Sequence, residues 1–70
     1  MNEKMKSEFG EFLDEFLTRY NLPAYRSPTA RMELFDISVW YCFSGWVDDE
    51  EDELGKVFDK KYAEMNKEAA

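Results

Sequence analysis

Six consecutive acidic residues form the densest group of ionisable side chains in this 70-residue sequence. They are Asp48, Asp49, Glu50, Glu51, Asp52 and Glu53. So many carboxylates could bind a cation, or a cationic surface on another molecule. An EF-hand calcium loop needs glycine at its sixth position and glutamate at its twelfth, where this sequence has Glu53 and Asp59. We therefore expect neither a metal site nor a cofactor in this segment.

The other reactive side chains offer little for catalysis. The sequence has no histidine and only one cysteine, Cys42. Without histidine the commonest general base at neutral pH is missing, and Ser–His or Cys–His nucleophile pairs cannot form. No lysine or arginine lies within one helical turn of Cys42 to lower the pKa of its thiol. We predict that the protein is not an enzyme, and a carboxylate- or metal-dependent enzyme is the least favoured alternative.

The acidic run accounts for most of the net charge. The chain has 16 acidic and nine basic residues, so its formal net charge is −7. The basic residues are scattered, whereas direct contact with nucleic-acid phosphates needs them clustered. The pattern therefore predicts no direct nucleic-acid binding and favours a protein partner with a Lys/Arg-rich surface. The alternative is a solvated helix start, where carboxylates face the positive end of the helix dipole.

Hydropathy gives no sign of a membrane partner. No apolar run approaches the ~20 residues that a membrane-spanning helix needs. The N-terminal residues lack the apolar core of a signal peptide, and a lone cysteine cannot build an internal disulfide framework. We expect a reduced, cytoplasmic protein.

Three segments must position these groups. In the first, about 3–20, apolar side chains recur at the spacing of one helix face. The third, about 49–67, has a similar apolar face, and Asp48 is its expected cap. With a second helix at about 28–44, we predict an all-α, compact three-helix domain in which residues 1–70 form a single domain.

The second segment has clear ends but an ambiguous middle. Ser27 and Pro28 predict a helix cap and first turn, and Gly45 is the expected C-terminal stop. Between them, apolar and more polar residues alternate from Phe35 to Phe43, which is also typical of a strand. An α+β fold with a strand or hairpin around 34–43 is therefore the alternative.

Read as a helix, the second segment has two apolar faces. The face expected to join the core consists of Met32, Phe35, Val39, Cys42, Phe43 and Trp46. Leu34, Ile37 and Tyr41 share the opposite face. A second apolar face predicts either a central helix or self-association, so we expect a possible homodimer through Leu34, Ile37 and Tyr41.

In size, acidity and lack of catalytic groups, the chain resembles the small acidic helical proteins with which phages and other mobile elements block host enzymes. This resemblance implies an inhibitor or regulator that acts by protein–protein contact. Residues 48–53 would imitate the phosphates of nucleic acid on a basic surface of the partner, while Trp46 and Trp40 act as aromatic anchors. The alternative is a homodimeric structural or assembly module without inhibitory activity.

Overall fold

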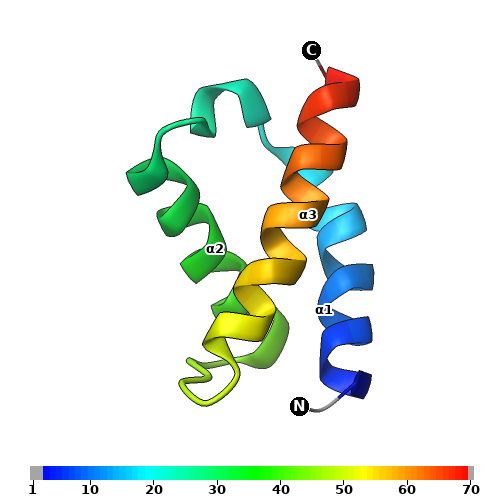
Figure 1. The fold of residues 1–70 in the computed structure, drawn as a ribbon, viewed down its shortest axis with the longest axis vertical. Helices are drawn as coiled ribbons and strands as arrows, with labels where there is room; N and C mark the ends of the chain where they lie inside the picture. Colours follow the sequence, from blue (N-terminus) through cyan, green and yellow to red (C-terminus); the bar gives the residue numbers. More distant parts are fainter. Residues whose placement is uncertain (1–2, 70) are drawn as a thin grey trace.

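Three α-helices make up most of the molecule (Figure 1). The structure, a computed structural model, describes residues 3–69. Its helices are α1 (Glu3–Phe16), α2 (Pro28–Phe43) and α3 (Glu51–Ala69), with 3-10 turns η1 (Leu17–Arg19) and η2 (Leu22–Tyr25) between α1 and α2. They run up, down and up, so that α2 is opposite in direction to α1 and α3 (Figure 1). The predicted all-α three-helix domain is confirmed.

The strand or hairpin considered around residues 34–43 is wrong, because these residues lie in α2 and no strand occurs among residues 3–69. The buried residues of α2 are Leu34, Phe35, Ser38 and Val39, which recur with the period of a helix. The alternating pattern arises because apolar side chains occupy the outer face of α2 as well as the inner one.

The ends of the first two helices differ slightly from the prediction. α1 ends at Phe16, and the predicted last turn is the 3-10 turn η1, whose Leu17 carbonyl accepts a hydrogen bond from the Tyr20 amide (3.2 Å). Ser27 caps α2 as expected, since its hydroxyl oxygen accepts a hydrogen bond from the Ala30 amide (3.1 Å). The left-handed residue that ends α2 is Ser44 (φ 58°) rather than the expected Gly45.

The third helix begins later than predicted. Asp48 is not its cap, because residues 48–50 form a turn in which the Asp48 carbonyl accepts a hydrogen bond from the Glu51 amide (3.3 Å). α3 starts at Glu51, and the Leu54 amide donates to the Glu50 carbonyl (2.9 Å). Half of the acidic run therefore precedes the helix, and half forms its first turn.

All three helices contribute to the core, and α1 and α3 form the closest helix pair. Phe9 and Leu13 of α1 and Leu54 and Phe58 of α3 are almost completely buried there. Gly10 is buried against α3, where a Cβ would make ordinary van der Waals contact with Lys61 and Val57. None of the helices in residues 3–69 is both long and apolar enough to cross a membrane.

The second helix is held to α3 by large side chains rather than by close backbone packing. The rings of Phe35 and Phe58 meet edge to face, with centroids 5.5 Å apart. The hydroxyl of Tyr62 on α3 donates a hydrogen bond to the carbonyl of Leu22 in η2 (2.7 Å), which ties the segment leading into α2 to the third helix. The guanidinium of Arg31 on α2 lies 5.9 Å from the Tyr62 ring centre. These large side chains keep the backbones of α2 and α3 apart.

Candidate partner-binding surface

The acidic run is divided between the turn before α3 and the first turn of α3. Asp48, Asp49 and Asp52 are exposed, and Glu50 and Glu51 are half-buried. Among the described residues, none of these five carboxylates forms a salt bridge. They therefore constitute an uncompensated negative surface, which we call the acidic segment (residues 48–52).

Glu53 behaves differently from the rest of the run. One carboxylate oxygen lies 3.8 Å from the Lys6 ammonium on α1, and the other lies 3.7 Å from Lys56. Successive residues of a helix turn by about 100°, so Glu53 points to the α1 side while Glu51 and Asp52 point towards α2. Of the six predicted partner-binding acids, Glu53 is thus the one already engaged within the chain.

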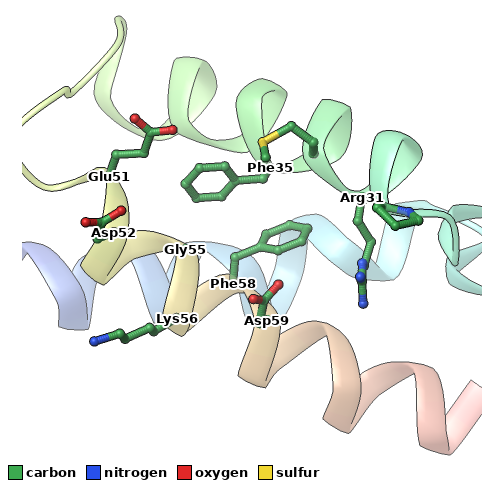
Figure 2. A pocket seen from close by; sticks show the side chains of 10 residues that line it. Arg31, Phe35, Glu51, Asp52, Gly55, Lys56, Phe58 and Asp59 are labelled. Atoms are coloured by element: carbon green, nitrogen blue, oxygen red, sulfur yellow. The ribbon is translucent and has the colours of Figure 1, made fainter.

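Glu51 and Asp52 stand at one end of a groove between α2 and α3 (Figure 2). The groove has a volume of about 350 Å³. Phe35 and Phe58 form its floor and Gly55 lies in the α3 wall, while Arg31 stands at the other end (Figure 2). We call this feature the α2–α3 groove.

The acidic and basic residues around the α2–α3 groove differ in whether they have partners within the chain. Glu51, Asp52 and Asp59 on α3 form no salt bridge within the described part of the chain. Of the two basic residues at the rim, Lys56 pairs with Glu53, whereas Arg31 lies over the uncharged Tyr62 ring and keeps its charge, so the acids outnumber the bases three to two. Figure 2 also shows the Lys56 side chain pointing away from the two phenylalanine rings. The groove therefore presents a net negative rim.

The two tryptophans lie in different surroundings. Trp46 is 36% exposed, and its ring meets Phe35 edge to face with centroids 6.2 Å apart, so it lies beside the groove floor and close in sequence to the acidic segment. Trp40 is 57% exposed and lies on α2. The structure therefore brings Trp46, but not Trp40, into contact with a residue of the groove floor.

The predicted self-association surface is only partly exposed. Leu34 is completely buried in the core and cannot share a surface with Ile37 and Tyr41. Ile37 and Tyr41 are 40% and 70% exposed, and Trp40 lies between them in sequence. The exposed outer face of α2 is thus Ile37, Trp40 and Tyr41. The Tyr41 ring also contacts the ring of Phe16 on α1, at a centroid distance of 6.0 Å.

The single thiol is partly buried against the core. Cys42 is half-buried on α2. Burial raises the pKa of the Cys42 thiol, and the negative charge of Glu8 on α1 raises it further. A raised pKa keeps the thiol protonated and unreactive near neutral pH, as expected for a packing residue.

Sequence reasoning missed most of the α2–α3 groove. Met32 was expected in the core, yet it is 55% exposed and lines the groove. Arg31, Gly55 and Asp59 had not been singled out as site residues. The available signal was Gly55, an unfavourable residue in the interior of a predicted helix.

No match is found when the chain is compared with protein-family models, with curated proteins and with solved structures. Among the described residues, no three His, Cys, Asp or Glu side chains come together as a metal site. What the protein binds is therefore inferred from the chemistry of its surface.

Proposed function

We propose that this protein is a small acidic binding module, an inhibitor or regulator that contacts a basic, nucleic-acid-binding surface of a partner protein. The observation that carries the proposal is the acidic segment, whose five carboxylates have no salt-bridge partner in the described chain and adjoin the partly exposed Trp46. A basic surface that binds phosphates would be attracted to these carboxylates by the same electrostatic force.

Such a contact would combine long-range electrostatic attraction with burial of an aromatic side chain. Uncompensated carboxylates attract a basic surface over roughly the Debye length, about 8–10 Å at physiological salt, and mainly accelerate encounter. An aromatic ring beside the charged rim supplies apolar burial, which holds the complex after encounter. The contact of the Trp46 ring with Phe35 supports this role, because a ring held by packing loses less conformational freedom on binding.

Charge reversal outside the groove tests the proposal. The double variant Asp48→Lys/Asp49→Lys should lose partners that the wild-type protein captures from a lysate, and salt of about 0.5 M should weaken wild-type capture. The matched control is Glu11→Lys/Glu64→Lys, which changes the charge equally at two other exposed positions. Heparin or duplex DNA should compete with the wild-type protein for the captured partner. Unchanged capture by Asp48→Lys/Asp49→Lys would refute the acidic contact.

A second candidate function is a homodimeric assembly module. It is favoured by the exposed outer face of α2, where Ile37, Trp40 and Tyr41 place three large side chains in solvent. Sedimentation at several concentrations should then show a dimer, and Ile37→Glu should abolish it while the helical circular dichroism persists. A strict monomer at high micromolar concentration would exclude this function.

A further inference from the structure

We infer that the α2–α3 groove receives a basic amphipathic helix of the partner protein, with an apolar side chain seated at Gly55 and Lys or Arg side chains beside Glu51, Asp52 and Asp59. The inference rests on the proposed function, because it identifies which part of a basic partner the protein holds. The groove would then be the specific binding site for a partner that the whole acidic segment attracts.

The shape of the groove suits a helix. The α2 wall consists of Pro28, Arg31, Met32 and Phe35, which have the i, i+3, i+4, i+7 spacing of one helix face. The lining residues of α3 likewise extend from Glu51 to Asp59. Each wall thus spans about two helical turns, or roughly 10–12 Å. An amphipathic helix lying between two helices buries its apolar face in this way, through anchors at the same spacing.

Gly55 gives the groove an opening that the fold itself does not need. It lies inside the 19-residue helix α3, where glycine is less favourable than alanine. Its φ is not positive, and a Cβ built at Gly55 would meet no atom within 4 Å. At Gly10, by contrast, a Cβ would lie 3.7 Å from Lys61 Cε and 3.9 Å from Val57 Cγ1. Neither backbone conformation nor packing therefore accounts for glycine at position 55, whereas close approach of another chain does.

The rim of the groove selects a cationic occupant. Glu51, Asp52 and Asp59 line it without a salt bridge in the described chain, and these three acids outnumber the two basic lining residues: Arg31, which lies over the Tyr62 ring at the far end, and Lys56, which pairs with Glu53. Lys or Arg on the partner would therefore meet unpaired carboxylates. The exposed side chain of Met32 is flexible and polarisable, so it can adapt to an apolar side chain that enters the groove.

The probe for this inference is a synthetic peptide of about 14 residues, four helical turns, with leucines on one face and lysines on the other. We expect it to bind the full chain and to shift the backbone amide resonance of Gly55 in two-dimensional NMR spectra. A Leu/Glu peptide with the same pattern should not bind. If the Leu/Lys peptide fails to bind at about 1 mM, or if the Leu/Glu peptide binds equally well, the inference is overturned.

Two pairs of variants locate the bound peptide. Gly55→Leu fills the opening with a good helix former and should raise the Kd for the Leu/Lys peptide at least tenfold, whereas Ala63→Leu, on an exposed part of the same helix, should leave it unchanged. Asp59→Asn, inside the groove, should weaken binding more than Asp48→Asn, outside it. Circular dichroism and thermal melting of each variant show whether the fold is intact.

The outcomes separate this inference from the proposed function. If the peptide shifts amides of residues 48–50 rather than Gly55, and Gly55→Leu binds it like the wild type, the groove is not the seat and the inference is overturned. The acidic segment would still stand or fall by the capture experiment with Asp48→Lys/Asp49→Lys. If peptide binding maps to Gly55 but that double variant captures partners normally, the groove inference holds and the broader acidic contact fails.

Discussion

Replacing Tyr62 by phenylalanine removes one hydroxyl that joins two distant parts of the fold. The hydroxyl donates a hydrogen bond of 2.7 Å to the Leu22 carbonyl, and both residues are buried, at 5% and 3% exposure. The aromatic ring itself remains in the variant, so its contact with Phe58, at a centroid distance of 6.1 Å, should be retained. The substitution therefore isolates the hydrogen bond from the packing.

The expected loss follows from the Leu22 carbonyl left behind. A buried acceptor that loses its partner destabilises a protein by about 1–3 kcal/mol. For a domain of this size, a loss of 1 kcal/mol lowers the Tm by about 4–8 °C. Because the bond ties η2 to α3, its loss should also increase hydrogen exchange at the hydrogen-bonded amides of Ala24 in η2 and Arg31 in α2, which is separated from η2 by two residues.

Urea unfolding, followed by tryptophan fluorescence, measures the difference in free energy of unfolding between Tyr62→Phe and the wild type. Tyr41→Phe is the matched control, because Tyr41 is 70% exposed and its hydroxyl can exchange any partner for water. The control should change the stability by no more than about 0.5 kcal/mol. Equal stabilities for Tyr62→Phe and Tyr41→Phe would refute the assignment of the Tyr62–Leu22 bond as a tertiary tie.

Leu34→Ala should lower the free energy of unfolding by about 2–5 kcal/mol in chemical denaturation, because Leu34 is completely buried. Ile37→Ala, at a 40% exposed position, should lower it clearly less, and equal losses would contradict the burial of Leu34. Cys42 should react with iodoacetamide near neutral pH more slowly than in urea-unfolded protein, because its raised pKa leaves less thiolate and burial restricts access. Glu8→Gln should lower the pKa of Cys42 slightly and speed the reaction, with desolvation still holding the pKa above its ordinary value; a slower reaction would reverse the assigned sign. Asp14→Asn removes a 2.6 Å ion pair with Lys61 of α3. Because the carboxylate is largely exposed, urea titrations should show a loss of at most about 1 kcal/mol in the free energy of unfolding, and a smaller loss at high salt. A larger loss that does not depend on salt would show that the pair acts as a buried one.

The helices follow from local features of the sequence. Apolar spacing predicted all three, and the Ser27–Pro28 pair correctly placed the start of α2, because capping depends on atoms only a few residues apart. The same reasoning erred at Asp48 and Gly45. α2 ends at Ser44 in the left-handed conformation, and a turn closed by the Asp48 carbonyl precedes α3. Both features depend on the path of the connection between α2 and α3.

The candidate site was foreseen in composition but not in arrangement. The acidic run and Trp46 could be read directly from the sequence, and the structure leaves most of those carboxylates unpaired. That Glu53 pairs with Lys6 could not be foreseen, since these residues are distant in sequence and meet only where α1 packs on α3. The open space at Gly55 could not be predicted either, because it depends on where α2 lies beside α3.

The sequence by itself determined that this chain is helical, has a concentrated acidic segment and lacks histidine-based chemistry, because each of these depends on residue type and short-range spacing. Only the tertiary structure decided which apolar residues of α2 are buried: it places Leu34 in the core and leaves Ile37, predicted on the same face, in solvent. The reason is geometric: a helix with two apolar faces can pack through either, and the choice depends on all the side chains it meets. The same packing holds Phe35 against Phe58 and leaves the groove between α2 and α3.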